Sequence, residues 1–280
     1  MKKAITVDLY SRWKEERYKK MKEHGYLGAN YSMANTETLI YTCSEDDMKS
    51  MMLHEKELAH SAGVEIFQVH GPWRWPPRDS TIGEQQERME KMKKSIRATA
   101  LLGCHYWVIH PLSPWGIDEK GTEAAKKTWD FNLCFMRELL ETAKRFDITI
   151  CLENLPFLNF SLATPSDILR FVKEIDDEYF KICLDTGHVA VFENLEVNEA
   201  IRELGQEIRV LHVHDNNRKG DQHMIPYFGR IDWSDFNPAL KDIGFNGMLT
   251  METVLPEKLS TPLYEEICRL TAKIAEKLIE

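Results

Sequence analysis

Six short apolar stretches of the chain end in a residue that can bind a metal ion or carry a proton. These residues follow one another at intervals of 27 to 43 residues: His70, His110, Glu153, Asp185, His212 and Glu252. Each interval is long enough for one strand, one helix and their connections. The carboxyl ends of neighbouring parallel strands meet at one edge of a sheet, so the spacing predicts a single site assembled from distant parts of the chain.

The acidic members of this set predict a bound cation. Glu153, Asp185 and Glu252 end the apolar stretches I-C-L-E, I-C-L-D and L-T-M-E. Burying one unpaired carboxylate is costly, and three that face one another repel. One divalent metal, Mn, Co, Mg or Zn, held by these three residues and His212 is the simplest charge balance. A single histidine at a strand end is more simply a hydrogen-bonded structural residue, so this prediction depends on the whole set.

Apolar runs alternate with longer amphipathic stretches along the chain, a pattern typical of βα units and a parallel sheet. The runs predict eight strands: Ala4–Leu9, Leu27–Met33, Val64–His70, Tyr106–His110, Thr149–Asn154, Lys181–Asp185, Arg209–His214 and Met248–Thr253. Helical periodicity is clearest over Glu45–Ala62, Gly83–Leu102, Thr122–Arg145, Pro165–Ile175 and Tyr264–Ile279. The sequence therefore predicts an α/β fold, a single (β/α)8 TIM barrel domain over residues 1–280.

Composition narrows the expected partners and location. The formal net charge of -9 repels a polyanion, so a small molecule is expected as partner and nucleic acid is not. No stretch reaches the roughly 20 apolar residues of a membrane helix, and the first residues lack a signal-peptide run, which predicts a cytoplasmic protein without a membrane partner. The six cysteines form no CxxC pair and are expected to be buried thiols, without disulfides or a cysteine metal site.

Five stretches together resemble the xylose isomerase-like barrel superfamily, in order over nearly the whole chain. They are C-L-E-N-L-P at 151–156, C-L-D-T-G-H at 183–188, H-V-H-D-N-N-R at 212–218, D-Q-H-M-I-P-Y-F-G-R-I-D-W at 221–233 and T-M-E-T at 250–253. The superfamily includes sugar and sugar-phosphate isomerases and epimerases as well as the zinc-dependent apurinic endonucleases. Many of its members pair, so a homo-oligomer is a further expectation.

Resemblance to the ketose epimerases implies a metal-dependent sugar or sugar-phosphate isomerase or epimerase. It implies that Glu153, Asp185, His212 and Glu252 hold the metal. Glu153 and Glu252 would also move a proton next to the substrate carbonyl, through an enediolate. His188 and Arg218 match positions that hold substrate oxygens in those enzymes.

The same superfamily supplies a rival hypothesis, hydrolysis of a phosphodiester at an abasic DNA site. Resemblance to the apurinic endonucleases implies three zinc ions held by nine residues, all of them present: His70, His110, Glu153, Asp185, His188, His212, Asp221, His223 and Glu252. The net charge, Gly187 where those nucleases carry cysteine, and W-R-W-P-P after His70 favour the isomerase or epimerase. A third hypothesis, a degenerate barrel that only binds a sugar or a partner, fits poorly with an intact set of metal ligands.

Aromatic and basic residues in the loops after the third and fourth strands predict a pocket wall. They are Trp73, Arg74, Trp75, Arg78 and Trp115. Indole faces cover the apolar side of a sugar, and an arginine pairs with a phosphate or carboxylate. With His70 and His110, we expect Trp73 and Trp115 to contact substrate, although packing of the loops against the barrel rim explains the tryptophans equally well, and Trp75 better.

Three further features flank the expected ligands. Asn154 and His214 are candidates for orienting them by hydrogen bonds, and His214 is alternatively a substrate contact. The Pro226–Asp232 stretch is either a lid or a fixed connector.

Overall fold

Eight parallel strands form one sheet in the computed structural model, which describes residues 1–73 and 79–280. Their order is β7-β6-β5-β4-β3-β2-β1-β8. The bounds are β1 (Lys2–Thr6), β2 (Gly28–Ser32), β3 (Glu65–His70), β4 (Tyr106–Ile109), β5 (Thr149–Glu153), β6 (Phe180–Asp185), β7 (Ile208–His212) and β8 (Met248–Met251).

The two strands at the ends of this order close the barrel. A parallel bridge joins Val213 to Met251, and the Val213 amide donates to the Thr250 carbonyl at 2.8 Å. In the next step along the chain, the Glu252 amide donates to the Val213 carbonyl at 3.1 Å. The predicted (β/α)8 barrel is therefore confirmed, and every strand end that carries a candidate ligand faces the same mouth.

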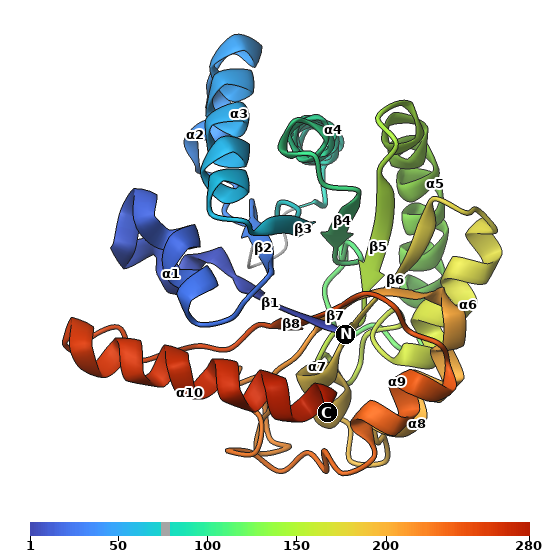
Figure 1. Cartoon of the computed structure of the whole chain (residues 1–280). Coiled ribbons are helices and arrows are strands. Elements are labelled where there is room, and N and C mark those ends of the chain that lie inside the picture. The colour runs from blue at the N-terminus through green and yellow to red at the C-terminus, as the bar shows by residue number, and fades with distance from the viewer. Residues whose placement is uncertain (74–78) are drawn as a thin grey trace.

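Helices surround the strands, as Figure 1 shows. The predicted ones are present as α3 (Glu45–Ser61), α4 (Ile82–Leu102), α5 (Glu123–Arg145), α6 (Pro165–Ile175) and α10 (Thr261–Ile279). The chain also forms η1 (Val7–Glu16), α1 (Arg17–Glu23), α2 (Leu39–Thr42), α7 (Thr186–Ala190), α8 (Val197–Leu204), η2 (Gly205–Glu207) and α9 (Phe236–Asp242). These shorter elements span too few turns to show a clear period in the sequence. Within the described ranges, no helix is both long and apolar enough to cross a membrane.

Side-chain caps explain where two of the predicted helices begin. Ser44 Oγ accepts a hydrogen bond from the Asp47 amide at the start of α3. Thr164 and Asp167 cap each other at the start of α6, whose first residue is Pro165. Each interaction satisfies backbone amides that have no partner inside the helix.

Most strands end one to three residues earlier than the sequence predicts, and the difference at β1 and β7 matters for the site. The strand predicted over Ala4–Leu9 stops at Thr6, and the chain turns into the 3-10 helix η1. The prediction was wrong beyond Thr6 because Val7 is buried without belonging to the sheet, so an apolar residue did not mark a strand residue. Likewise β7 ends at His212, which leaves His214 in the loop that follows.

Close packing beneath the mouth explains the glycine that follows His70. A Cβ on Gly71 would lie 2.4 Å from Cζ2 of Trp107. Trp107 is fully buried, and its Nε1 donates to Ser95 Oγ at 2.8 Å. The indole thus occupies the space that any side chain at position 71 would need.

A buried carboxylate holds the loop after β7. Asp215 is completely buried and accepts hydrogen bonds from a set of donors in this loop: the amides of Tyr227, Arg230 and Ile231 and the indole of Trp233, at 3.0 to 3.1 Å. A Cβ on Gly229 would lie 2.2 Å from Asp215 Oδ1, so the chain here packs directly on the carboxylate. This is the geometry of a fixed connector, the second of the two interpretations of Pro226–Asp232.

We expect Asp215→Asn to destabilise the fold by about 2 to 4 kcal/mol. Asparagine keeps the shape but turns an NH2 group toward backbone and indole donors, which leaves buried groups unpaired. Chemical denaturation measures the loss, and limited proteolysis reports opening of the 226–232 loop. Asp232→Asn, on the exposed side of the same loop, is the matched control and should lose well under half as much. Equal stability of the two variants would contradict this role.

Candidate active site

The mouth of the barrel brings the four predicted metal ligands together. Glu153, Asp185 and His212 end β5, β6 and β7, and Glu252 directly follows β8. One ligand atom from each lies within 4.8 Å of the other three. His212 Nδ1 lies between two carboxylates, 2.8 Å from Glu153 Oε1 and 3.0 Å from Glu252 Oε2. Their role as metal ligands stays a prediction that this geometry fits.

The charges of these residues depend on one another. Burial by itself raises the pKa of Glu153, but the neighbouring His212 and His110 outweigh burial and hold that pKa well below its ordinary value. Burial also raises the pKa of Glu252, but His212 outweighs burial and lowers that pKa to about 2. Burial lowers the pKa of His212, yet Cys183, Glu153 and Glu252 raise it well above the usual value. In the metal-free protein a protonated His212 therefore lies between two carboxylates.

The donor set suits a divalent cation. Three carboxylates and one imidazole offer oxygen and nitrogen ligands of the kind that Mn, Co, Mg and Zn accept. At separations below 4.8 Å the carboxylates require positive charge among them. A cation at this position would replace the proton of His212. Cys183 also lies within ligand distance of Glu153 and His212, although the sequence had predicted no role for a cysteine.

Hydrogen bonds from three directions orient the Asp185 carboxylate and its backbone. The His188 amide donates to Asp185 Oδ1 at 2.7 Å, and His214 Nε2 lies 3.0 Å from Asp185 Oδ2. Asn154 makes a reciprocal pair with the Asp185 backbone, at 2.8 and 3.0 Å. Asn154 and His214 thus contact a predicted ligand, but it is Asp185 and not the ligands that they flank in the sequence, Glu153 and His212.

His214 leaves no room for a side chain at position 187. A Cβ on Gly187 would lie 1.9 Å from Cε1 of His214, and His214 is completely buried. His223 stacks on this ring, with the two ring centroids 3.9 Å apart. Gly187 is therefore required by the histidine that contacts Asp185.

Two further groups of candidate ligands adjoin the four. His70 and His110 approach the second oxygen of Glu153, with Nε2 atoms 3.5 and 3.0 Å from Oε2. Asp221 Oδ2 lies 3.2 Å from His188 Nε2 and 3.1 Å from His223 Nε2. All nine residues of the rival hypothesis therefore lie in one continuous cluster.

Asp221 stabilises positive charge on both of its histidine partners. Burial lowers the pKa of His188, but Asp185 and Asp221 outweigh it and raise that pKa to about 10. The pKa of His223 rises to about 9, because Asp221 and Glu252 outweigh burial. Burial raises the pKa of Asp221, whereas His188 and His223 lower it well below the usual range.

A cavity of about 450 Å³ opens onto these residues. Its lining is Thr6, Asp8, Ser32, Ala34, His70, Trp73, His110, Glu153, Leu155, Pro156, Phe157, His188, Asp221, His223 and Glu252. Trp73 is one of the lining residues, with its ring edge-on to that of His110 at 5.4 Å between centroids, and its contact with substrate stays a prediction. A sugar-sized molecule fits this volume and reaches both glutamates.

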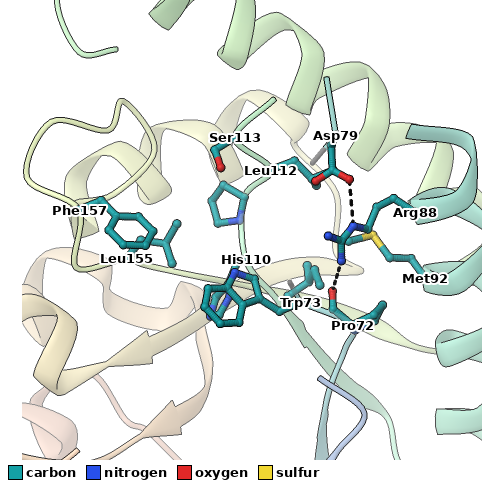
Figure 2. Close-up of a pocket in the computed structure, with 12 residues that line it drawn as sticks. Pro72, Trp73, Asp79, Arg88, Met92, His110, Leu112, Ser113, Leu155 and Phe157 are labelled. Carbon is teal, nitrogen blue, oxygen red and sulfur yellow. Dashed lines mark hydrogen bonds and ion pairs between the residues drawn. The ribbon is translucent and has the colours of Figure 1, made fainter. Parts of the chain in front are cut away.

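A buried ion pair supports the loop that carries Trp73. Figure 2 shows the Arg88 side chain reaching from α4 to the carbonyl of Pro72 at 3.1 Å and to Asp79 Oδ1 at 3.2 Å. Arg88 and Asp79 are each 3% exposed. The pair thus fixes the carbonyl beside Trp73, and a smaller cavity of about 20 Å³ lies between it and His110.

Two predicted substrate contacts, Trp115 and Arg218, are not among the residues that line this cavity. Trp115 is 47% exposed and packs edge-on against Phe131. Arg218 pairs with the carboxylate of Glu196 at 2.6 and 2.8 Å and lines a different groove. The substrate roles of Trp115 and Arg218 stay predictions that this geometry does not support. Arg74, Trp75 and Arg78 lie outside the described residues.

The cavity also contains residues that the sequence analysis missed. Asp8 was placed inside the first strand, yet it lies beyond the strand end and lines the cavity beside Ser32. Partial burial and then Glu252 raise the pKa of Asp8. Leu155 and Phe157 lie in the loop that follows the predicted ligand Glu153, so the rule that loops after strand ends form the site could have found them.

Comparison with known proteins places this chain in a family. Residues 19–273 match the family described as xylose isomerase-like TIM barrel, and the chain belongs to it. D-psicose 3-epimerase of Ruminiclostridium cellulolyticum is 30% identical over 203 residues, which cover 70% of this chain and 66% of that protein. An uncharacterized protein of Methanocaldococcus jannaschii is 30% identical over 233 residues, 79% of this chain and 76% of its own length.

Solved structures agree with this fold. D-psicose 3-epimerase from Clostridium cellulolyticum H10, determined with D-tagatose, superposes with a TM-score of 0.79 at 20% identity and full coverage of both chains. At that identity the likeness establishes the barrel and not the reaction.

We expect the affinity for Mn²⁺ to be about 10- to 100-fold weaker at pH 6 than at pH 8. The pKa of His212 is raised, so the metal-free protein keeps this proton at neutral pH, and a metal ion bound there must displace it. Affinity therefore falls as protons become more abundant. Titration calorimetry in two buffers of different ionisation enthalpy measures both the affinity and the protons released. His105→Ala, on an exposed histidine, should leave the pH slope unchanged, and a flat pH dependence in the unaltered protein would refute this account.

Proposed function

We propose that this protein is a metal-dependent sugar isomerase or epimerase that moves a proton next to a carbonyl group. The observation that carries this proposal is the pair formed by Glu153 and Glu252. Glu153 ends β5 and Glu252 directly follows β8, both contact His212 Nδ1, and both line the cavity. The epimerases among its relatives support the same reaction class.

The two glutamates are suited to take and return a proton. Their lowered pKa values keep both carboxylates ionised, so either can accept a proton from a substrate carbon in the cavity. In this proposal one ionised glutamate takes the proton from the carbon, and the other, after taking up a proton from solvent, delivers that proton to the opposite face. The first glutamate then releases its own proton to solvent. A bound divalent cation would supply positive charge beside the oxygen on which negative charge develops in the enediolate.

Other residues of the cavity orient the substrate. His188 lines it and is fixed by hydrogen-bond contact between its Nδ1 and the Asn154 carbonyl at 2.7 Å. His70 and His110 present imidazole groups beside Glu153, where they can contact hydroxyl oxygens. Trp73 offers an apolar face to the ring or chain carbons of a sugar.

A second candidate function is zinc-dependent hydrolysis of a phosphodiester at an abasic DNA site. The observation in its favour is that His70 and His110 adjoin Glu153, while Asp221 joins His188 to His223, as a three-zinc centre requires. The packing of His214 against Gly187 weighs against it, because the cysteine of the resembled nucleases would not fit there. We therefore place the sugar isomerase or epimerase first.

Glu252→Gln should lower kcat by a factor on the order of 10² to 10⁴. The amide keeps the size of the side chain but accepts no proton, and it is a weaker metal ligand. Epimerisation of free ketoses followed by chromatography measures the rate, and elemental analysis measures the metal. Glu257→Gln, an exposed change in the same loop, is the control. Normal activity and normal metal content in Glu252→Gln would end the two-carboxylate mechanism.

Metal content separates the two candidate functions. Protein purified without added metal should contain about one divalent ion per chain as an isomerase, against about three zinc ions as a nuclease. His110→Ala sharpens the comparison: it should leave the single ion in place in the first case and remove one of the three in the second. Incision of a duplex with one abasic site, with an intact duplex as control, is the direct assay of the nuclease. Three zinc ions and specific incision would reverse our order of preference.

A further inference from the structure

Asp8 brings to the cavity a carboxyl group that the proposed proton transfer does not use. The chain leaves β1 at Thr6 and turns into η1, which places Asp8 on the cavity wall with Thr6 and Ser32. The side chain is solvent-accessible, so a molecule in the cavity can reach it. These residues come from the first two βα units, whereas the four predicted metal ligands come from the last four.

The cavity has two walls of different chemistry. Thr6, Asp8 and Ser32 form what we call the polar wall, beside β1 and β2. Leu155 and Phe157, in the loop after β5, form an apolar wall. In the strand order of the closed barrel, four steps separate β1 from β5 in either direction, so the walls face each other.

The polar wall follows the strand next to β8, so it lies to one side of the two proton-transfer residues in the same cavity. Strand β1 pairs with β8, whose end carries Glu252, and the charge of Glu252 is felt at Asp8. A sugar whose carbonyl end lies beside Glu153 and Glu252 therefore extends between the polar and apolar walls. Its carbon-bound hydrogens suit Leu155 and Phe157, and its hydroxyl groups suit the polar wall.

A carboxylate is a selective partner at this place. It accepts hydrogen bonds from neighbouring hydroxyl groups, and such charge-assisted bonds are stronger than neutral ones. The hydroxyls of Thr6 and Ser32 add partners that donate or accept. A phosphate group beside Asp8 would instead meet a like charge in a partly desolvated cavity.

We propose that Asp8 is a specificity-determining residue, which binds hydroxyl groups at the end of the sugar remote from the carbonyl and rejects a phosphate there. This inference rests on the proposed sugar isomerase or epimerase activity. It assigns to Asp8 the choice between a free sugar and its phosphate ester, while Glu153 and Glu252 carry out the proton transfer.

The test compares Asp8→Asn and Asp8→Ala with the unaltered, Mn²⁺-loaded protein. D-fructose, D-psicose, D-tagatose and their 6-phosphates are the probes. We expect Asp8→Asn to raise KM for the preferred free ketose about 10-fold with kcat changed less than about 3-fold, since the lost contact is remote from the reacting carbon. Preference for the free ketose over its phosphate should fall about 10-fold in both variants, since both remove the repelling charge. Asp46→Asn, on an exposed acid of α3, is the matched control.

Equilibrium binding by calorimetry separates failure of this inference from failure of the proposed function. Binding of a free ketose, weakened in Asp8→Asn and accompanied by no turnover, would refute the reaction but support Asp8. Two outcomes would overturn the role of Asp8 alone. In one, the protein turns over free ketoses but binds a 6-phosphate as tightly as the free ketose; in the other, the preference for the free ketose is unchanged in both Asp8 variants. Absence of binding to every probe would contradict both.

Discussion

Three carboxylates that repel one another lie at the mouth of this barrel, and the structure around them has to offset that repulsion. Glu153, Asp185 and Glu252 present oxygens within 4.8 Å of one another, in a place largely removed from water. Such an arrangement persists only with positive charge among the oxygens. His212 supplies it in the metal-free protein by holding a proton between two of the carboxylates. The same need makes the site receptive to a divalent cation, and links cation binding to the loss of that proton.

Packing around the site follows from keeping these groups in place. His214 holds one oxygen of Asp185 and occupies the space above Gly187. In the same way, the Trp107 ring occupies the space that a side chain at Gly71, next to His70, would need. In both places a glycine is required by a ring that arrives from another βα unit. The site therefore depends on small residues whose importance comes from contacts rather than from turn conformation.

Different strands supply different kinds of residue to the cavity. The last four strands supply the predicted metal ligands, two of which are the glutamates that we propose move protons. The first two supply Asp8 and Ser32, and the loops after the third and fifth supply apolar surface.

Sequence alone determined the barrel and the candidate ligands that meet at its mouth, since both are encoded by repetition. Apolar runs recur at the βα interval, and the carboxyl ends of parallel strands coincide, so the residue type at each strand end was enough to bring Glu153 and Glu252 together. The path of the chain after each strand, and the direction of the side chains there, were decided only by tertiary structure. Asp8 reached the cavity because the chain turned at Thr6, and Arg218 turned away toward Glu196. The direction of a side chain in such a loop is set by partners from distant segments, and no local pattern records them.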